Sequence, residues 1–406
     1  MKKWGCFLAL IILTALFYFG NAMAEEARDI TGECKVTATA GKFKITRVYD
    51  RDLTTYWTSS KEKVSYIQLT APQGKKLWHL YVCFWEELDN WRIQVLKNGN
   101  WVDYEEHLAR YAHEYVYLGG VDGIRVCSRN DKRAVLSVNE IYVFSEGDVP
   151  EWVQRWVDPP EKVDMMLLSA HPDDEILFFG GTLPYYAGEK KKDILVAYMT
   201  CGTFARRSEL LNGLWTCGVH IYPSIGDFWD KYSKKLDTAY DAWGKTKTWT
   251  YVTELIRKYK PDILLTHDVN GEYGHGAHRV CADAALRCIS YAADSEKYPD
   301  SAEKFGTWQV KKLYIHLYDQ GKINMDWDKP LSAFDGLTGY QVAVNAYKEH
   351  VTQQSAGQKN PVTGKYEPFI VEPAESDYSC YRFGLAYTAV GEDVIKNDFF
   401  ENIEDE

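Results

Sequence analysis

From Val163 onward, short apolar runs alternate with helical stretches, and this alternation limits the possible folds more than any other feature of the chain. The apolar runs are Met165–Ser169, Ile194–Met199 and Asp262–Thr266, with a further candidate at Leu313–Leu317. Short runs dominated by aliphatic residues are typical of parallel strands that are buried on both faces. Helices are predicted between them, at 206–217 and 246–258. Strands that alternate with helices predict a doubly wound α/β domain, which we place at residues 163–320.

Residues 31–146 carry a different pattern. Short stretches rich in β-branched and aromatic residues are separated by Gly, Asn and Asp turns, and the predicted strands lie at 64–69, 91–95, 123–126 and 140–144. This is the pattern of an all-β sandwich. An acidic, proline-bearing linker follows at 147–162. Residues 321–406 mix polar and aromatic stretches, and we expect a helix and loops packed on the α/β domain.

The first residues predict export. Lys2 and Lys3 precede an almost unbroken apolar run from Cys6 to Gly20, and Ala22-Met23-Ala24 is the small-x-small pattern that a signal peptidase recognises. The apolar run is short for a membrane span of roughly 20 residues. A cleaved signal peptide at residues 1–24 is therefore favoured over a retained anchor. We expect a secreted, periplasmic or cell-surface protein without a stable membrane span after cleavage.

Charge and cysteine content narrow the possible partners. Once Lys2 and Lys3 leave with the signal, 45 of the 47 basic residues remain against 58 acidic ones, for a formal charge of −13. Such a balance argues against nucleic acid as a partner. Eight cysteines remain in the exported chain, and an even number permits disulfides. A bond between Cys34 and Cys127 would join the two ends of the first domain.

The run His171-Pro172-Asp173-Asp174-Glu175 directly follows the first buried strand. In a doubly wound sheet, ligands bind at the carboxyl ends of the strands. A turn at Pro172 can bring His171 and Asp174 to one side and leave Asp173 free to face a bound water. One nitrogen and one carboxylate form part of a zinc site, which needs a third ligand and an open position. Alone, the run could equally be a solvated acidic turn.

A second cluster follows the third strand, where three of the ten histidines fall between residues 267 and 278. His275 and His278 are three residues apart at the start of a predicted helix, 279–292, and would share one face. Either could reach the metal and leave the other for substrate, so His267 is expected to be structural. Because the two clusters both follow strands of one predicted α/β sheet, they predict a catalytic metal centre.

These two clusters, together with Gly180-Gly181-Thr182-Leu183 and Arg206-Arg207-Ser208-Glu209-Leu210, resemble the PIG-L/LmbE family over about residues 162–320. Members of this family are zinc-dependent de-N-acetylases of N-acetylglucosamine-containing substrates, with a Rossmann-like fold. The resemblance implies one catalytic Zn²⁺ and an acetamido-sugar glycan as the substrate. A nucleotide is not expected, because the chain lacks a GxGxxG loop.

The resemblance also implies catalytic roles for single residues. Asp173 matches the general base that takes a proton from the zinc-bound water. His275 matches a residue that, when protonated, stabilises the oxyanion or assists the leaving amine. Tyr273 matches a tyrosine that polarises the acetamide carbonyl. The residues that match the zinc ligands are His171, Asp174 and His278.

The matched substrate contacts are Arg206, Arg207 and Asp227, the last with the weakest alignment. One position departs from the family. Ala277 stands where relatives often have an acid directly before the last histidine. A carboxylate that keeps His275 charged would therefore have to come from elsewhere, such as Asp268 or Glu272.

The first domain has a likeness of its own. The segments Asp50–Thr58, Tyr66–Leu69 and Val138–Ile141 resemble the discoidin-like, coagulation-factor type C jelly roll. This resemblance implies a carbohydrate-binding module and allows a structural Ca²⁺ near Asp50.

The sequence as a whole predicts an exported zinc hydrolase that removes the acetyl group from an N-acetylhexosamine glycan or glycoconjugate of the GlcNAc or GalNAc type. Two alternatives stay open. One is a glycan-binding or adhesion protein that has lost its activity, and the other is a zinc hydrolase of a non-sugar amide. Protein partners are not predicted.

Overall fold

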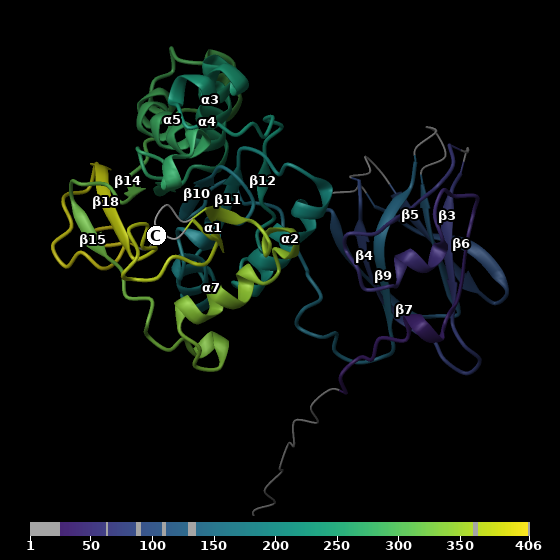
Figure 1. Cartoon of the computed structure of the whole chain (residues 1–406). Coiled ribbons are helices and arrows are strands. Elements are labelled where there is room, and N and C mark those ends of the chain that lie inside the picture. Colours follow the sequence, from purple (N-terminus) through teal and green to yellow (C-terminus); the bar gives the residue numbers. More distant parts are fainter. Residues whose placement is uncertain are drawn as a thin grey trace, which may run out of the picture.

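The computed structural model describes residues 25–61, 64–86, 91–107, 111–128, 135–359 and 364–404. The predicted signal peptide, residues 1–24, lies outside the described residues. The predicted fold class is confirmed, because a β-sandwich is followed by a doubly wound α/β domain (Figure 1). Within the described residues, no helix is both long enough and apolar enough to cross a bilayer.

The N-terminal part consists of two antiparallel sheets packed face to face. The five-stranded sheet has the order β1-β3-β8-β5-β6, and the four-stranded sheet has the order β2-β9-β4-β7. Their inward side chains, among them Ile67, Leu80 and Ile93, form one buried core. The strands are β1 (Lys35–Ala38), β2 (Trp57–Thr58), β3 (Tyr66–Thr70), β4 (Leu77–Phe84), β5 (Trp91–Lys97), β6 (Asn100–His107), β7 (His113–Val121), β8 (Gly123–Ser128) and β9 (Ser137–Phe144).

The α/β domain is built on a seven-stranded sheet with the order β12-β11-β10-β13-β14-β18-β15. Its strands are β10 (Met165–Ser169), β11 (Ile194–Tyr198), β12 (Ser224–Ile225), β13 (Ile263–Thr266), β14 (Lys312–His316), β15 (Lys322–Asn324) and β18 (Arg382–Thr388). The first five in the chain pair in parallel. The chain runs outward from β10 on one side and returns to β13 on the other. The carboxyl ends of these two strands therefore meet at the switch point, where open α/β sheets bind ligands.

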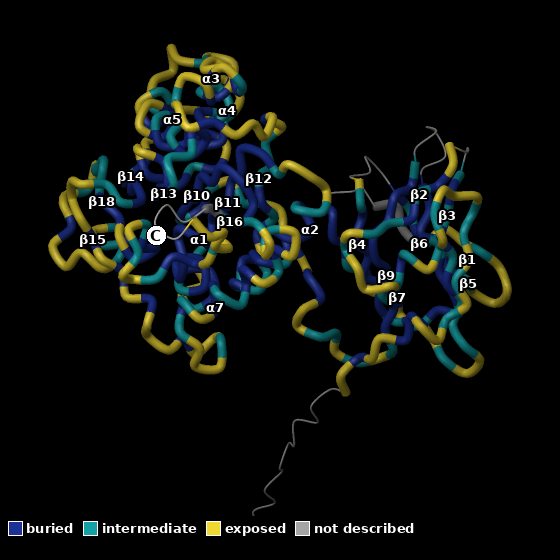
Figure 2. The backbone as a smooth tube through the Cα atoms, viewed as in Figure 1, coloured by how far each residue is buried: buried dark blue, intermediate teal, exposed yellow. Residues whose placement is uncertain are grey.

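Helices cover both faces of this sheet. Met165 and Leu167 of β10 pack into the core that includes α1 and α2, whereas Met166 and Leu168 pack into the core with α4 and α5. This alternation follows from the two-residue period of a strand. Figure 2 accordingly shows buried residues along the strands of the sheet and exposed residues on the outer sides of the helices. The helices are α1 (Asp174–Leu177), α2 (Phe204–Thr216), α3 (Leu236–Trp243), α4 (Lys245–Tyr259), α5 (Gly276–Ala293), α6 (Pro299–Phe305) and α7 (Gly339–Tyr347).

The C-terminal segment differs from the expectation of a helix and loops. Besides α7, it contributes β15 and β18 to the main sheet, and β18 pairs antiparallel with β14. A separate small ladder joins β16 (Gly357–Lys359) to β17 (Tyr366–Pro368). Gly384 lies within β18 at a position where a side chain would collide with the carbonyl oxygens of Tyr318 and Gln320. The strand was missed because its pairing with β14, rather than a local hydrophobic pattern, decides its conformation.

The linker at 147–162 is bonded to both parts of the chain. Gln154 bonds His113 of the sandwich at 2.8 Å and Asn212 of α2 at 2.6 Å. All cysteines of the described residues are free thiols. The proposed Cys34–Cys127 disulfide is therefore not formed. The Cys34 thiol donates instead to the carbonyl oxygen of Ile30, 3.3 Å away.

A buried arginine fixes the end of α5, the helix that carries His278. The Arg257 side chain on α4 is fully buried, and its guanidinium donates to the carbonyl oxygens of Tyr291, Ala292, Asp294, Lys297 and Tyr298. We expect Arg257→Met to lower the free energy of unfolding by about 3 kcal/mol or more, because several buried carbonyl groups lose their donors. Denaturant unfolding measures the loss.

Arg287→Met is the matched control for this prediction. Arg287 lies on α5 and pairs with Asp283, but its side chain is 49% exposed. The control should change stability by less than about 1 kcal/mol. Equal losses in the two variants would contradict the anchoring role of Arg257.

Candidate active site

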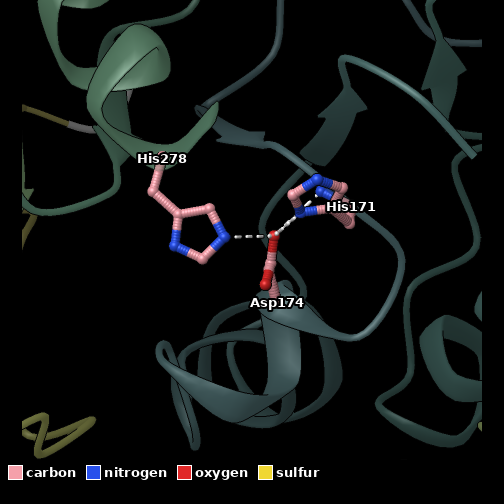
Figure 3. A group of neighbouring side chains, drawn as sticks. All are labelled: His171, Asp174 and His278. Carbon is pink, nitrogen blue, oxygen red and sulfur yellow. Dashed lines mark hydrogen bonds and ion pairs between the residues drawn. The ribbon is translucent and has the colours of Figure 1, made fainter. Parts of the chain in front are cut away.

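Three of the predicted ligands meet at the switch point of the sheet. His171 follows β10, Asp174 is the first residue of α1, and His278 lies in the first turn of α5. Asp174 Oδ2 is 2.9 Å from His171 Nδ1 and 3.2 Å from His278 Nε2 (Figure 3). All three are buried, and their ligand atoms lie within 4.8 Å of one another. Two imidazoles and one carboxylate form a donor set that suits a divalent metal such as zinc and leaves a fourth position for a water or substrate.

The carboxylate of Glu272 lies behind the candidate ligands and orients one of them, His278. This fully buried carboxylate accepts hydrogen bonds from Nδ1 of His278 at 2.8 Å, of His267 at 2.9 Å and of His316 at 2.6 Å. Burial opposes ionisation, but these three imidazoles hold the pKa of Glu272 well below its usual range. Because His278 donates from Nδ1, its Nε2 is free to face Asp174 and a metal.

The other two histidines on Glu272 have structural partners. His267 Nε2 accepts from the backbone N–H of Ala170 at 3.0 Å, which ties the end of β13 to the end of β10. This agrees with the structural role expected for His267. His316 Nε2 faces the carbonyl oxygen of Ser379 at 3.0 Å. Both ring nitrogens of His316 therefore face oxygen atoms, which holds the ring between Glu272 and the backbone at Ser379.

Asp173 lies beside the ligands in a strained conformation. Its φ is 98°, a region that non-glycine residues rarely adopt outside functional sites. Its backbone N–H donates to Glu175 Oε2 at 2.9 Å, and its Oδ1 accepts from Arg206 Nη2 at 3.1 Å. Burial raises the pKa of the Asp173 carboxyl to about 7, although Arg206 opposes this rise. A carboxylate with that pKa can exchange protons near neutral pH.

His275 lacks the carboxylate partner that its predicted charged form requires. Its Nδ1 accepts from the backbone N–H of Ala277 at 3.2 Å, and within the described chain neither Asp268 nor Glu272 bonds it. Burial, followed by the proximity of His278 and His171, lowers the pKa of His275 to about 2. The ring is therefore neutral, with its proton on Nε2. It can still donate a hydrogen bond, but not as an imidazolium.

Tyr273 contacts a part of the chain that sequence reasoning did not connect with the site. Its hydroxyl donates to Glu372, which also accepts from the hydroxyl of Ser376. Its ring stacks on Phe369, with the centroids 5.2 Å apart. The C-terminal segment thus fixes the position of Tyr273. No local signal in the sequence links these residues, since almost 100 positions separate Tyr273 from Glu372.

These groups open into a cavity of about 240 Å³. The predicted residues that line it are His171, Asp173, Asp174, Arg206, Tyr273, His275 and His278. The lining residues that the sequence did not indicate include Asp230, Tyr232, Gln353 and Phe369. A larger cavity of about 560 Å³ lies between the sandwich and α2, but none of the predicted catalytic or ligand residues lines it.

Two of the predicted substrate contacts lie elsewhere. Arg207 is buried and donates to the carbonyl oxygen of Trp85 at 2.8 Å, toward the sandwich. Successive helical residues point in different directions, so only Arg206 of this pair faces the cavity. Asp227 is exposed and pairs with Lys247 at 2.8 Å. Asp230, three residues further on, lies in the cavity instead, with its Oδ1 3.5 Å from His171 Nε2.

The calcium site near Asp50 stays a prediction. Asp50 accepts from the Thr55 hydroxyl at 2.9 Å and from the backbone N–H of Asp52 at 3.1 Å. In the part of the chain that the structure describes, the groupings of three or more side chains that could hold a metal involve His171, Asp174 and His278 or His267, Glu272 and His278.

The role of Glu272 can be tested through metal affinity. Glu272→Gln removes the negative charge and one acceptor from the three histidines, so His278 loses its fixed orientation. We expect the affinity for Zn²⁺ to fall about 10- to 100-fold, as measured by competition with a chelator. Glu254→Gln on α4 is the control and should bind metal as the unmodified chain does. Unchanged affinity in Glu272→Gln would contradict the role given to this carboxylate.

Comparison with known proteins agrees with this geometry. Residues 166–289 match the PIG-L family, described as GlcNAc-PI de-N-acetylase. The 1D-myo-inositol 2-acetamido-2-deoxy-alpha-D-glucopyranoside deacetylase 1 of Frankia alni is 25% identical over 36% of this chain and 60% of its own. The mycothiol S-conjugate amidase of Streptomyces coelicolor is 28% identical over 40% of this chain and 62% of its own. The chain thus spans about three fifths of the length of these curated relatives.

Solved structures align with both parts at low identity. The N,N'-diacetylchitobiose deacetylase from Pyrococcus horikoshii covers 48% of this chain and 72% of its own, at 18% identity and a TM-score of 0.35. The family 32 CBM of C. perfringens NanJ, in complex with galactose, covers 29% of this chain and 99% of its own, at 12% identity and a TM-score of 0.26. The family match over the strands and helices that carry His171, Asp174 and His278 identifies residues 166–289 as a PIG-L family domain.

Proposed function

We propose that this chain is a zinc-dependent hydrolase that removes the acetyl group from an acetamido sugar. The observation that carries the proposal is the meeting of His171, Asp174 and His278 around one point, with the Asp173 carboxylate lining the same cavity. A metal donor set beside a carboxylate base is an arrangement that supports metal-assisted hydrolysis of an amide by water.

The chemistry follows from the positions of these side chains. His171, Asp174 and His278 would hold Zn²⁺, which when bound acidifies water and polarises a carbonyl group. Asp173 takes the proton of the attacking water as its oxygen bonds to the acetamide carbon. The Nε2–H of neutral His275 donates to the developing oxyanion. The C–N bond then breaks, and Asp173 returns the proton to the leaving amine, so that acetate and a free amino sugar are the products.

Arg206 serves Asp173 in this scheme. Its Nη2 bonds both the Asp173 carboxylate and the carbonyl oxygen of Pro172. These bonds fix the direction of the carboxylate and stabilise its charged form. The main role of Arg206 is therefore to orient Asp173, and the direct contact with the sugar that the sequence predicted is secondary.

The substrate class is supported by the relatives. The matched family and the Frankia alni relative are both named for the removal of acetyl groups from glucosamine-type sugars. A sandwich that resembles discoidin-like modules would bind carbohydrate beside the hydrolase. The predicted signal peptide supports export, with action on extracellular or periplasmic glycans. The choice between GlcNAc and GalNAc is left to assay.

A second candidate is hydrolysis of a larger amide. The Streptomyces coelicolor relative is named as an amidase, and the same zinc chemistry would serve an amide whose acyl part is not acetyl. The two candidates differ in their products. Release of acetate favours the deacetylase, and release of a free amine without acetate favours the amidase.

Loss of the base should abolish turnover without loss of the metal. We expect Asp173→Ala to lower kcat for acetate release about 10²- to 10⁴-fold. The other carboxylates that line the cavity cannot replace it, because Asp174 belongs to the ligand set and Asp230 lies beside His171. Zinc content should stay near one ion per chain. The exposed variant Asp237→Ala is the control. Retained activity in Asp173→Ala would refute the assignment of the base.

The pH profile tests Arg206. Because the Arg206 guanidinium lowers the pKa of Asp173, Arg206→Gln should raise that pKa. Asp173 must be deprotonated to act, so the acidic limb of kcat/KM should move to higher pH. A bound cation would lower the pKa of Asp173 in the variant and in the unmodified chain alike, so the expected direction of the shift stays the same. Arg206→Lys keeps the charge and should shift the limb less. A limb that stays in place in Arg206→Gln would contradict the coupling.

A further inference from the structure

Two exposed aromatic side chains lie on the loop that joins β12 to α3, the loop that also brings Asp230 to the candidate active site. Trp229 is 67% exposed and Tyr232 is 63% exposed, which makes them the most exposed aromatic residues of the described chain. Between them, Asp230 lines the cavity and lies 3.5 Å from His171 Nε2 and 3.7 Å from Arg206 Nη1. Large exposed aromatic side chains next to a polar cavity are typical of ligand-binding surfaces.

The backbone of this loop is anchored at its start. Gly226 donates to the carbonyl oxygen of Tyr198 at 2.9 Å, and Phe228 donates to that of Met199 at 3.3 Å. A side chain at Gly226 would lie 2.6 Å from the Met199 oxygen, so the loop can approach β11 this closely only with glycine. The Phe228 ring is buried against Trp243.

The loop is also anchored after the two aromatic residues. The carbonyl oxygen of Trp229 accepts from Trp243 Nε1 at 2.9 Å, and that of Ser233 accepts from the N–H of Gly276 at 2.7 Å, at the start of α5. The apolar anchor of the loop is thus Phe228, while Trp229 and Tyr232 stay outside the core. Their exposure is a consequence of the fixed backbone and does not come from a loose loop.

The two aromatic residues reach different depths. Tyr232 lines the cavity and its ring meets His275 edge-on, with the centroids 5.0 Å apart. Trp229 does not line the cavity and lies outside it, with Lys231 Nζ 5.4 Å from its ring centroid. A separate aromatic wall comes from the C-terminal segment, where Phe369 lines the same cavity. Tyr232 thus belongs to the cavity wall, and Trp229 is an exposed aromatic residue three positions before it on the same loop.

We propose that Trp229 and Tyr232 form a platform for the sugar unit next to the acetamido sugar, so that the substrate is an oligosaccharide or polysaccharide chain. The proposal rests on the deacetylase function proposed above and specifies its substrate class. A cavity of about 240 Å³ holds the reacting sugar, and the next unit of a chain must leave through the rim. There the apolar face of a pyranose ring stacks on Trp229, and Asp230 and Lys231 bond its hydroxyl groups.

The charges around the platform favour a glycan over an apolar partner. Asp230 and Lys231 lie between the two aromatic residues, and Asp227 on the same loop pairs with Lys247 of α4. A hydrophobic protein or lipid surface would have to desolvate these charged groups without replacing their hydrogen bonds, at a cost in free energy. Sugar hydroxyls can replace those bonds.

The test compares chain lengths on the zinc-loaded full chain. Acetate release is measured from the methyl glycoside of GlcNAc and from the β-1,4-linked GlcNAc tetramer. The unmodified chain should show a higher kcat/KM on the tetramer. In Trp229→Ala, the ratio of the two kcat/KM values should fall about tenfold, since a stacked aromatic residue at the centre of a contact contributes on this scale.

Two further variants and a binding measurement make the outcome unambiguous. Trp229→Phe keeps a ring and should retain most of the ratio, and Tyr117→Ala, 53% exposed on β7, should keep it in full. Calorimetry with the fully deacetylated tetramer should show an about tenfold weaker Kd for Trp229→Ala, independently of turnover. A ratio and a Kd that Trp229→Ala leaves unchanged would overturn the platform, as would equal kcat/KM on both substrates. If the unmodified chain releases acetate neither from these two substrates nor from the corresponding GalNAc compounds, the deacetylase function itself fails and the platform with it.

Discussion

The carboxylate of Glu272 is the group on which the geometry of the site depends. It is fully buried and bonds histidines from the end of β13, from α5 and from the end of β14. A buried charge without partners costs several kcal/mol, so these three elements can pack only in the register that brings His267, His278 and His316 to it. The same register places His278 opposite Asp174. The arrangement of the candidate metal ligands thus follows from how one buried charge is neutralised.

Three consecutive acids next to this centre have three different environments. Despite burial, His278 and His171 hold the pKa of Asp174 well below its usual range, as suits a metal ligand. Burial raises the pKa of Asp173 toward neutrality, although Arg206 and, to a smaller extent, His350 oppose this rise. Glu175 is fully buried, accepts from the backbone N–H of Asp173, and lies 3.4 Å from His350 Nε2. Because Asp173 has a positive φ, these three side chains can point in different directions. Asp174 points toward the histidine ligands, Asp173 toward Arg206, and Glu175 toward His350.

Much of this site could be predicted from sequence because its signals are local. A buried strand followed by His171-Pro172-Asp173-Asp174 indicates both the sheet and the edge at which the residues collect. Asp230, His316 and Glu372 could not be found in this way, since only the folded chain brings Asp230 to the cavity, His316 to Glu272 and Glu372 to Tyr273. Arg206 and Arg207 show the limit most directly. They are adjacent in the sequence, yet one faces Asp173 and the other faces Trp85, because helical position decides between them.

The segment beyond residue 320 is part of the active site as well as of the fold. Strand β18 extends the sheet, and the backbone N–H of Glu372 donates to the carbonyl oxygen of Leu177 at 3.0 Å. That bond brings the carboxylate of Glu372 to Tyr273 and the ring of Phe369 to the cavity wall. The family match ends at residue 289, so these walls come from chain outside it. The matched core therefore carries His171, Asp174 and His278, and the segment beyond it supplies part of the cavity wall.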